Sequence, residues 1–296
     1  MTNTTSTKAA WLNAQYNNRA RVADHADFLA QWARDSQRAR DGLACVLDLP
    51  FLGADSHRSE ARALPGVPTL DVFPSARPHS PVLLFIHGGW WRSLDKRDHS
   101  FIAPPFVSAG ITVVIPNYNL CPAVGVDTIA WQMAQALAWT HRRITAYSGD
   151  AQRIVVAGHS AGGHLAAMLL CCDGRKVASD LPAQMCGSAL AVSGVFDMQP
   201  LRLTPFLKAD LKLTAATAHR VSPAFFPPPK GRLTTVYGAL ESEEFARQSQ
   251  LIQSRWGRDV VPVCEAVPDT NHFSVLNELV NPQARLHQQA LHMLTH

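Results

Sequence analysis

The chain has 296 residues, of which 47% are hydrophobic and 17% are charged, a composition typical of a globular enzyme with a large core. The formal net charge of +4 is small, and Lys and Arg are scattered along the chain, which excludes the basic footprint of a nucleic-acid-binding protein. No apolar stretch is long enough to span a bilayer, and the polar N-terminus lacks the pattern of a secretory signal. We therefore expect a cytoplasmic protein that neither enters a membrane nor binds nucleic acid.

Cysteine and histidine spacing gives no sign of a metal site. The six cysteines lack zinc-type spacing, and the thirteen histidines form no HExxH motif. We expect no metal and no organic cofactor, and the expected partner is a small-molecule substrate. The sequence contains no coiled-coil or other assembly signature, so it leaves a homodimer open.

The predicted elements alternate between helix and strand. Residues 1–18 are polar and predict a loosely ordered arm, and residues 19–40 have apolar side chains at helical spacing. The expected strands, the first two of them joined by a loop, are 43–49, 67–73, 82–86, 111–118, 153–157, 189–193, 233–237 and 260–265. The expected later helices are 98–109, 126–145, 160–171, 243–256 and 284–294.

This alternation predicts a single α/β domain over residues 1–296, with a mostly parallel sheet flanked by helices. Residues 82–86 are apolar on both faces, which is typical of a central strand in a covered parallel sheet. Residues 199–230 are irregular and rich in proline. We interpret them as a small cap-like excursion over the carboxyl edge of the sheet, where such folds bind ligands.

The segment GHSAG at 158–162 lies between a predicted strand and a predicted helix. This is the context of the G-x-S-x-G motif, in which a strained strand-to-helix turn lifts a serine hydroxyl clear of the sheet. We predict that Ser160 is a catalytic nucleophile. A chance match in a structural turn would not be expected to have this context.

The segment FIHGGWW at 85–91 follows the central strand and resembles the HGGG-type loop that supplies oxyanion donors in lipases and esterases. The third glycine of that pattern is replaced by Trp90. We predict that the backbone amides of Gly88, Gly89 and Ala161 form the oxyanion hole.

The expected chain order of the remaining catalytic groups is Asp or Glu and then His. His272 lies on a turn between a late strand and a late helix, where a general base can reach Ser160. Glu241 is the first acidic residue after the strand 233–237, and we favour it as the acid that orients His272. Asp197, which follows the strand 189–193, is the alternative.

Several longer segments resemble the kynurenine formamidase (arylformamidase) branch of the α/β-hydrolases. The segments that carry the resemblance are YNNRARVADHADFLAQWARDS, HGGWWRSLDKRDHSFIAPPF, PNYNLCPAVGVDTIAWQ, AGHSAGGHLAAML, SGVFDMQPL, LESEEFARQSQ and NHFSVLNEL, and they cover nearly the whole chain. The resemblance implies the α/β-hydrolase fold, the nucleophile Ser160 and the base His272. At the family's acid position this chain has Glu241 instead of Asp. The family hydrolyses N-formyl aryl amides, chiefly N-formylkynurenine in tryptophan breakdown.

Aromatic residues near the motifs predict a pocket for an aryl group. The candidates are Trp90, Trp91, Tyr118, Phe225 and Phe226. The same residues and machinery also fit a carboxylesterase that acts on small or aromatic esters. A non-catalytic binding protein on this scaffold is a third hypothesis, but such a protein would be expected to have lost the serine, the histidine or the oxyanion glycines.

Overall fold

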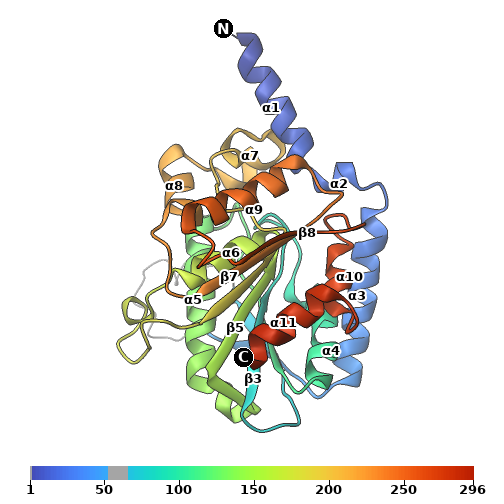
Figure 1. Ribbon diagram of the computed structural model, residues 1–296, viewed down its shortest axis with the longest axis vertical. Coiled ribbons are helices and arrows are strands. Elements are labelled where there is room, and N and C mark those ends of the chain that lie inside the picture. Colours follow the sequence, from blue (N-terminus) through green and yellow to red (C-terminus); the bar gives the residue numbers. More distant parts are fainter. Residues whose placement is uncertain (1, 53–65) are drawn as a thin grey trace.

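A mostly parallel sheet of eight strands lies at the centre of the computed structural model, which describes residues 2–52 and 66–296 (Figure 1). The strand order is β1-β2-β4-β3-β5-β6-β7-β8. The strands are β1 (Val46–Pro50), β2 (Thr69–Phe73), β3 (Ser80–Ile86), β4 (Thr112–Pro116), β5 (Gly149–His159), β6 (Ser188–Val192), β7 (Arg232–Gly238) and β8 (Val263–Val267). All eight expected strands are present, with ends that differ by a few residues. The loop expected between the first two strands lies largely outside the described residues.

The parallel part of the sheet runs from β4 to β8. Leu84 at the centre pairs with Val114 of β4 on one side and with Val156 of β5 on the other. All three side chains are fully buried, as the unbroken apolar runs predict. The strand β2 runs antiparallel to both β1 and β4 at one edge of the sheet.

Helices cover both faces of the sheet (Figure 1). On one face lie α5 (Val126–Arg143), α6 (Ala161–Leu170) and α9 (Glu243–Trp256). On the other face lie α3 (His25–Gly42), α4 (Ala103–Ser108), α10 (Val275–Val280) and α11 (Arg285–Thr295). The result is the three-layer arrangement of an α/β-hydrolase. Within the described ranges, no helix is long and apolar enough to cross a membrane.

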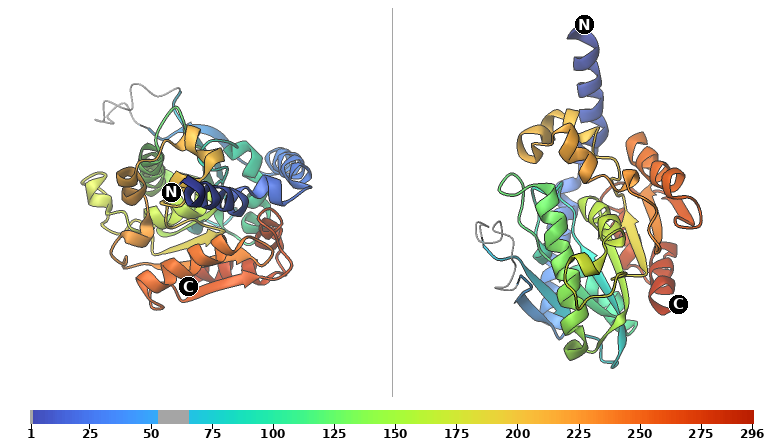
Figure 2. Two further views of the ribbon diagram at one scale, coloured as in Figure 1. Left: turned by 90° about the horizontal axis from the view of Figure 1, so that it is seen from above. Right: turned by 90° about the vertical axis from the view of Figure 1, so that its left-hand side faces the viewer.

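The N-terminal segment differs from the loose arm predicted for residues 1–18. Residues Thr2–Tyr16 form the helix α1, which projects beyond the end of the molecule near α7 and α8 (Figures 1 and 2). Leu12 and Tyr16, one helical turn apart, are buried against the rest of the protein. The prediction was wrong because these two contacts at one end of a polar helix leave almost no periodic signal.

Residues 199–230 also contain more regular structure than expected. They form two short helices, α7 (Pro205–Leu211) and α8 (Ala215–Arg220), linked by turns. Thr214 caps α8 by accepting a hydrogen bond from the amide of Thr217, a local signal that the sequence interpretation overlooked. Figure 2 shows both helices at the end of the molecule where α1 emerges.

Candidate active site

Ser160 stands at the turn between β5 and α6. Its backbone has φ 56° and ψ −115°, a conformation that costs free energy for any residue other than glycine. The amide of Ser160 donates to the carbonyl oxygen of Val192 at 2.8 Å, and its own carbonyl oxygen accepts from the amide of His164 at 3.1 Å. These two bonds hold the strained turn between the sheet and the first turn of α6.

Two glycines make this turn sterically possible. A Cβ atom on Gly162 would lie 1.9 Å from the carbonyl oxygen of Ile86, and one on Gly158 would lie 2.2 Å from the carbonyl oxygen of Gly162. Real side chains do not tolerate such distances. The glycines of the motif therefore let β3, β5 and α6 approach closely beneath Ser160.

His272 and Glu241 lie on neighbouring loops at the carboxyl ends of β8 and β7. The Nδ1 atom of His272 lies 2.7 Å from Oε2 of Glu241, and the Glu241 carboxylate is completely buried. Because an ionised carboxylate only accepts hydrogen bonds, Nδ1 carries a hydrogen and donates it. This bond leaves the Nε2 atom of His272 without its hydrogen and able to accept a proton.

The carboxylate of Glu241 is held by two further donors. Its Oε1 atom accepts from the hydroxyl of Ser193 at 2.5 Å and from the amide of Gly238 at 2.7 Å. Three donors replace the hydrogen bonds that the buried carboxylate would make with water. Gly238 has no room for a side chain, since a Cβ atom there would lie 2.4 Å from the carbonyl oxygen of Thr270. The loops that carry Glu241 and His272 are thus in direct contact.

The alternative acid, Asp197, lies elsewhere. Its Oδ1 atom accepts from the amide of Gln199 at 2.9 Å, and its Oδ2 atom lies 3.9 Å from Arg247. Among the described residues its side chain makes no contact with His272. The geometry therefore supports Glu241, and the extra methylene relative to Asp is accommodated by the bonds from Ser193 and Gly238.

His159 also supports the base, a role that the sequence did not reveal. Its Nε2 atom donates to the carbonyl oxygen of His272 at 2.8 Å, and the two rings lie 4.7 Å apart between centroids. Burial lowers the pKa of His159 well below its usual value, and the nearby His272 lowers that pKa further. His159 therefore stays neutral and fixes the backbone of His272.

The loop after β3 presents Gly88 and Gly89 beside Ser160. The hydroxyl of Tyr118 donates to the carbonyl oxygens of His87 and Gly88, both at 3.0 Å. In a trans peptide the amide of the following residue points away from the carbonyl oxygen. The amides of Gly88 and Gly89 therefore point away from Tyr118. A Cβ atom on Gly88 would lie 3.2 Å from the Cβ atom of Ser160, which places this loop directly at the nucleophile.

The remaining conformation of the loop depends on Gly89. Its φ of +106° suits glycine, and a Cβ atom there would lie 2.0 Å from the carbonyl oxygen of Ser93. On the other side of Ser160, Ala161 is the first residue of α6. Its amide belongs to the first turn of a helix, where amides have no partner within the helix and the dipole favours negative charge.

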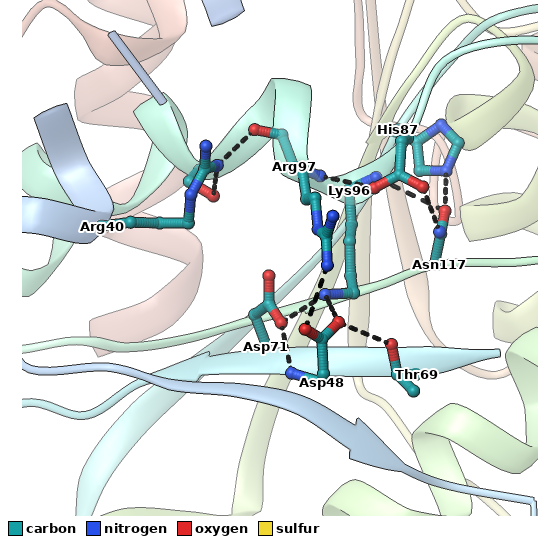
Figure 3. A network of polar contacts seen from close by, with 10 residues as sticks. Arg40, Asp48, Thr69, Asp71, His87, Lys96, Arg97 and Asn117 are labelled. Atoms are coloured by element: carbon teal, nitrogen blue, oxygen red, sulfur yellow. Dashed lines mark hydrogen bonds and ion pairs between the residues drawn. The ribbon is translucent and has the colours of Figure 1, made fainter. Parts of the chain in front are cut away.

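A polar network joins the antiparallel edge of the sheet to His87, the residue that precedes Gly88 and Gly89 (Figure 3). The ammonium of Lys96, 2% exposed, donates to Asp71 at 2.5 Å and to Asp48 at 2.8 Å. The amide of Lys96 donates to Oδ1 of Asn117 at 3.4 Å, and the same oxygen lies 2.9 Å from Nε2 of His87. Because the buried ammonium is paired with two carboxylates, its desolvation is compensated. The network links the antiparallel edge of the sheet to the base of the loop.

Ser160 and His272 line a common cavity of about 180 Å³. Its walls are aromatic: Trp32 comes from α3, Trp90 from the oxyanion loop, Phe206 from α7 and Phe273 from the turn beside His272. The ring of Trp90 meets that of Phe206 edge-on at 6.0 Å. Besides Ser160, His159 and His272, the polar residues of the lining are Asn17, Asn18, Arg19, Arg92 and Ser93.

Of the five aromatic residues predicted for the pocket, only Trp90 lines this cavity among the described residues. Trp91 is fully buried, with its ring against His164, and Tyr118 lies behind the oxyanion loop. Phe225 stacks on His219, and Phe226 follows it in the same turn, away from the cavity. The structure therefore does not bring these four residues to the cavity that Ser160 and His272 line. Trp32, Phe206 and Phe273 are in their place, and no local pattern singled them out.

Comparisons with known proteins place this geometry in a family. The family model BD-FAE matches residues 70–207. A kynurenine formamidase from Danio rerio is 30% identical over 268 residues, which are 88% of this chain and 85% of the relative. The chain belongs to the kynurenine formamidase family of α/β-hydrolases.

Solved structures agree on the fold. A protein from Silicibacter sp. is 26% identical, covers 96% of this chain and 99% of its own, and has a TM-score of 0.80. An esterase from Pyrobaculum calidifontis is 16% identical and has a TM-score of 0.68. The match covers 91% of this chain and 92% of the esterase chain. The predicted fold class and the family resemblance are confirmed. Because its homologues are hydrolases, we assign the protein to the hydrolases.

Proposed function

We propose that this protein is a serine hydrolase that removes the formyl group from an N-formyl aryl amide, such as N-formylkynurenine. The observation that carries the proposal is the pairing of His272 with the buried Glu241 carboxylate at the same cavity that Ser160 enters from its strained turn. Family membership agrees, since a relative that shares 85% of its length with this chain is a kynurenine formamidase.

The catalytic sequence follows from the roles of these groups. The Nε2 atom of His272 takes the proton of Ser160, and the serine oxygen attacks the formyl carbon. The amides of Gly88, Gly89 and Ala161 stabilise the oxyanion of the tetrahedral intermediate. The C–N bond then breaks as His272 gives its proton to the departing aromatic amine. Water repeats the sequence on the formyl-serine, which releases formate and restores the serine hydroxyl.

The dimensions and walls of the cavity favour a small, aromatic substrate. Its volume of about 180 Å³ is close to the roughly 150 Å³ of a cavity that holds one benzene ring. Trp32, Trp90 and Phe206 offer ring faces and edges to an aryl group. A formyl group requires almost no acyl pocket, so the aromatic walls are left for the amine half of the substrate.

The test compares kcat/KM for N-formylkynurenine, N-acetylkynurenine and short p-nitrophenyl esters, with Ser160→Ala as the control. We expect deformylation to exceed deacetylation of the matched amide and to disappear in Ser160→Ala. Fast ester cleavage with negligible deformylation would replace the formamidase assignment by that of a carboxylesterase that uses the same three catalytic residues.

A further inference from the structure

The cavity has a cationic rim that the catalytic sequence does not use. Two guanidinium groups, those of Arg19 and Arg92, line the cavity, and no Asp or Glu side chain does so among the described residues. The charge of Arg92 is matched by an ion pair with Asp210, and its Nη1 atom also donates to the carbonyl oxygen of Phe206 at 2.9 Å. Arg19 reaches one side-chain acceptor in the described part of the chain, the hydroxyl of Ser93 at 3.5 Å, and no carboxylate.

Next to Arg19 lies Asn18, whose side-chain nitrogen has no hydrogen-bond partner among the described residues. Asn18 is 4% exposed and lines the same cavity, yet its Nδ2 atom is buried without a hydrogen-bond partner among the described residues. A buried donor without an acceptor costs free energy, so native proteins rarely retain one without a reason. An acceptor on a ligand in the cavity would supply the missing partner.

The segment that carries both side chains is firmly anchored. Tyr16, at the end of α1, is fully buried and donates to the carboxylate of Glu244 in α9 at 2.5 Å. Its ring meets Trp90 and Phe245 edge-on, at 5.8 and 5.9 Å between centroids. These contacts fix the start of the following turn, which buries Asn18 against the cavity and leaves Arg19 exposed at the rim of the cavity.

We infer that Asn18 and Arg19 bind a carboxylate on the leaving group of the substrate. The inference rests on the proposed function, since it concerns the amine half of the molecule that Ser160 deformylates. An amide N–H and a guanidinium are donors only, and together they match the oxygens of a carboxylate. The substrate would then lie with its formyl group at Ser160, its ring between the aromatic walls and the carboxylate of its amino-acid group at the N-terminal segment.

The experiment measures the ratio of kcat/KM for N-formylkynurenine to kcat/KM for its α-carboxamide, in which the negative charge is absent. We expect Arg19→Gln to lower this ratio about tenfold, in line with the loss of a hydrogen bond to a charged group. Arg21→Gln is the matched control, because Arg21 lies in the same short helix and does not line the cavity. Equal ratios in the wild-type, Arg19→Gln and Arg21→Gln proteins would overturn the inference.

Asn18→Leu separates binding from a purely structural role. Leucine has a similar shape and removes the unpartnered donor, so we expect an unchanged or higher melting temperature together with a lower ratio. A retained ratio in a stable Asn18→Leu protein would show that the amide does not bind the substrate.

A second substrate pair keeps this test independent of deformylation. The same ratio is measured for 3-(4-acetoxyphenyl)propanoate and its primary amide, two aryl esters that differ in one negative charge. If the wild-type protein deformylates neither kynurenine substrate, the proposed function fails, and the ester pair still decides the inference. A preference for the acid that Arg19→Gln abolishes would support the carboxylate site, and a wild-type protein that treats the two esters alike would overturn it.

Discussion

Two regions meet at the cavity, and they differ in how many buried hydrogen bonds hold their functional side chains. The loops after β5, β7 and β8 hold their functional groups through buried bonds, and the Glu241 carboxylate alone accepts three. The opposite wall comes from α2 (Asn18–Arg21), α3 and α7. Asp210 of α7 forms an ion pair with Arg92 of the loop after β3, and each of the two side chains is about 30% exposed. Chemistry requires fixed angles, whereas substrate recognition tolerates adjustment. Changes in the loops should therefore lower kcat, and changes in the wall should raise KM or alter the choice of substrate.

Among the substitutions that leave Ser160 in place, the largest expected effect comes from Glu241→Gln. The new amide group would donate to Nδ1 of His272 and reverse the tautomer, so that Nε2 would carry a hydrogen and no longer accept a proton from Ser160. We expect kcat to fall by about 10²–10⁴-fold with KM nearly constant. The matched control is Asp197→Asn, which should behave like the wild-type protein. A larger loss in Asp197→Asn than in Glu241→Gln would return the role of the acid to Asp197.

This contrast also shows what the sequence could reveal. Ser160, Glu241 and His272 could be predicted as neighbours because each follows a predictable strand, and because carboxyl ends of parallel strands meet at one edge of a sheet. The strand positions themselves followed from apolar runs that the sheet buries on both faces. Here local pattern and global fold give the same answer.

The opposite wall depends on tertiary packing and left no such pattern. Trp32 lies on an amphipathic helix, where an apolar residue is expected to pack against the core, and Phe206 lies in a short helix within a segment predicted to be irregular. Asn18 resembled any other polar residue until Tyr16 was seen to anchor the segment through Glu244. The contacts that define these positions span up to 232 residues of sequence, as in the hydrogen bond between Gln248 and Tyr16.

A smaller effect is expected for Tyr118→Phe, which removes the hydroxyl that fixes the carbonyls of His87 and Gly88. The donors remain but lose their fixed direction, so kcat should fall roughly tenfold, less than the ~10²–10³-fold typical of deleting an oxyanion donor. Tyr147→Phe serves as the control, because Tyr147 precedes β5 and Ser160 follows the other end of that strand. Wild-type kcat in Tyr118→Phe would show that the loop holds its shape without this bond.

For the substrate wall, Phe206→Leu should raise KM several-fold and leave kcat nearly unchanged. The substitution removes a ring that meets Trp90 edge-on and lies 5.4 Å from the guanidinium carbon of Arg92, contacts of roughly 1 kcal/mol. Phe225→Leu is the matched control, since Phe225 stacks on His219 outside the cavity. An equal rise in KM in both variants would contradict the position of the substrate site.

The smallest effect on activity, but a measurable one on stability, concerns His164. This side chain is fully buried beneath Ser160, and burial lowers its pKa to about 4 from the usual value near 6.5. Because the folded pKa is depressed, the unfolded chain binds the proton more tightly, and stability declines as pH falls from 6.5 towards 4. The linked loss at pH 5 is about 2 kcal/mol. His164→Gln keeps a donor for Val221 but does not titrate, so its melting temperature should depend less on pH in this range. If the melting temperatures of the two proteins fell equally as the pH is lowered across this range, the depressed pKa of His164 would be contradicted.

The most direct test of the central claim is deformylation of N-formylkynurenine by the wild-type and Ser160→Ala proteins side by side, with the melting temperature of each recorded. The arrangement of Ser160, His272 and Glu241 predicts measurable kcat/KM in the wild-type protein. It predicts a loss of about 10⁴-fold or more in Ser160→Ala, at an unchanged melting temperature. Equal rates in the two folded proteins would contradict the account, because the formyl group would then be removed without Ser160.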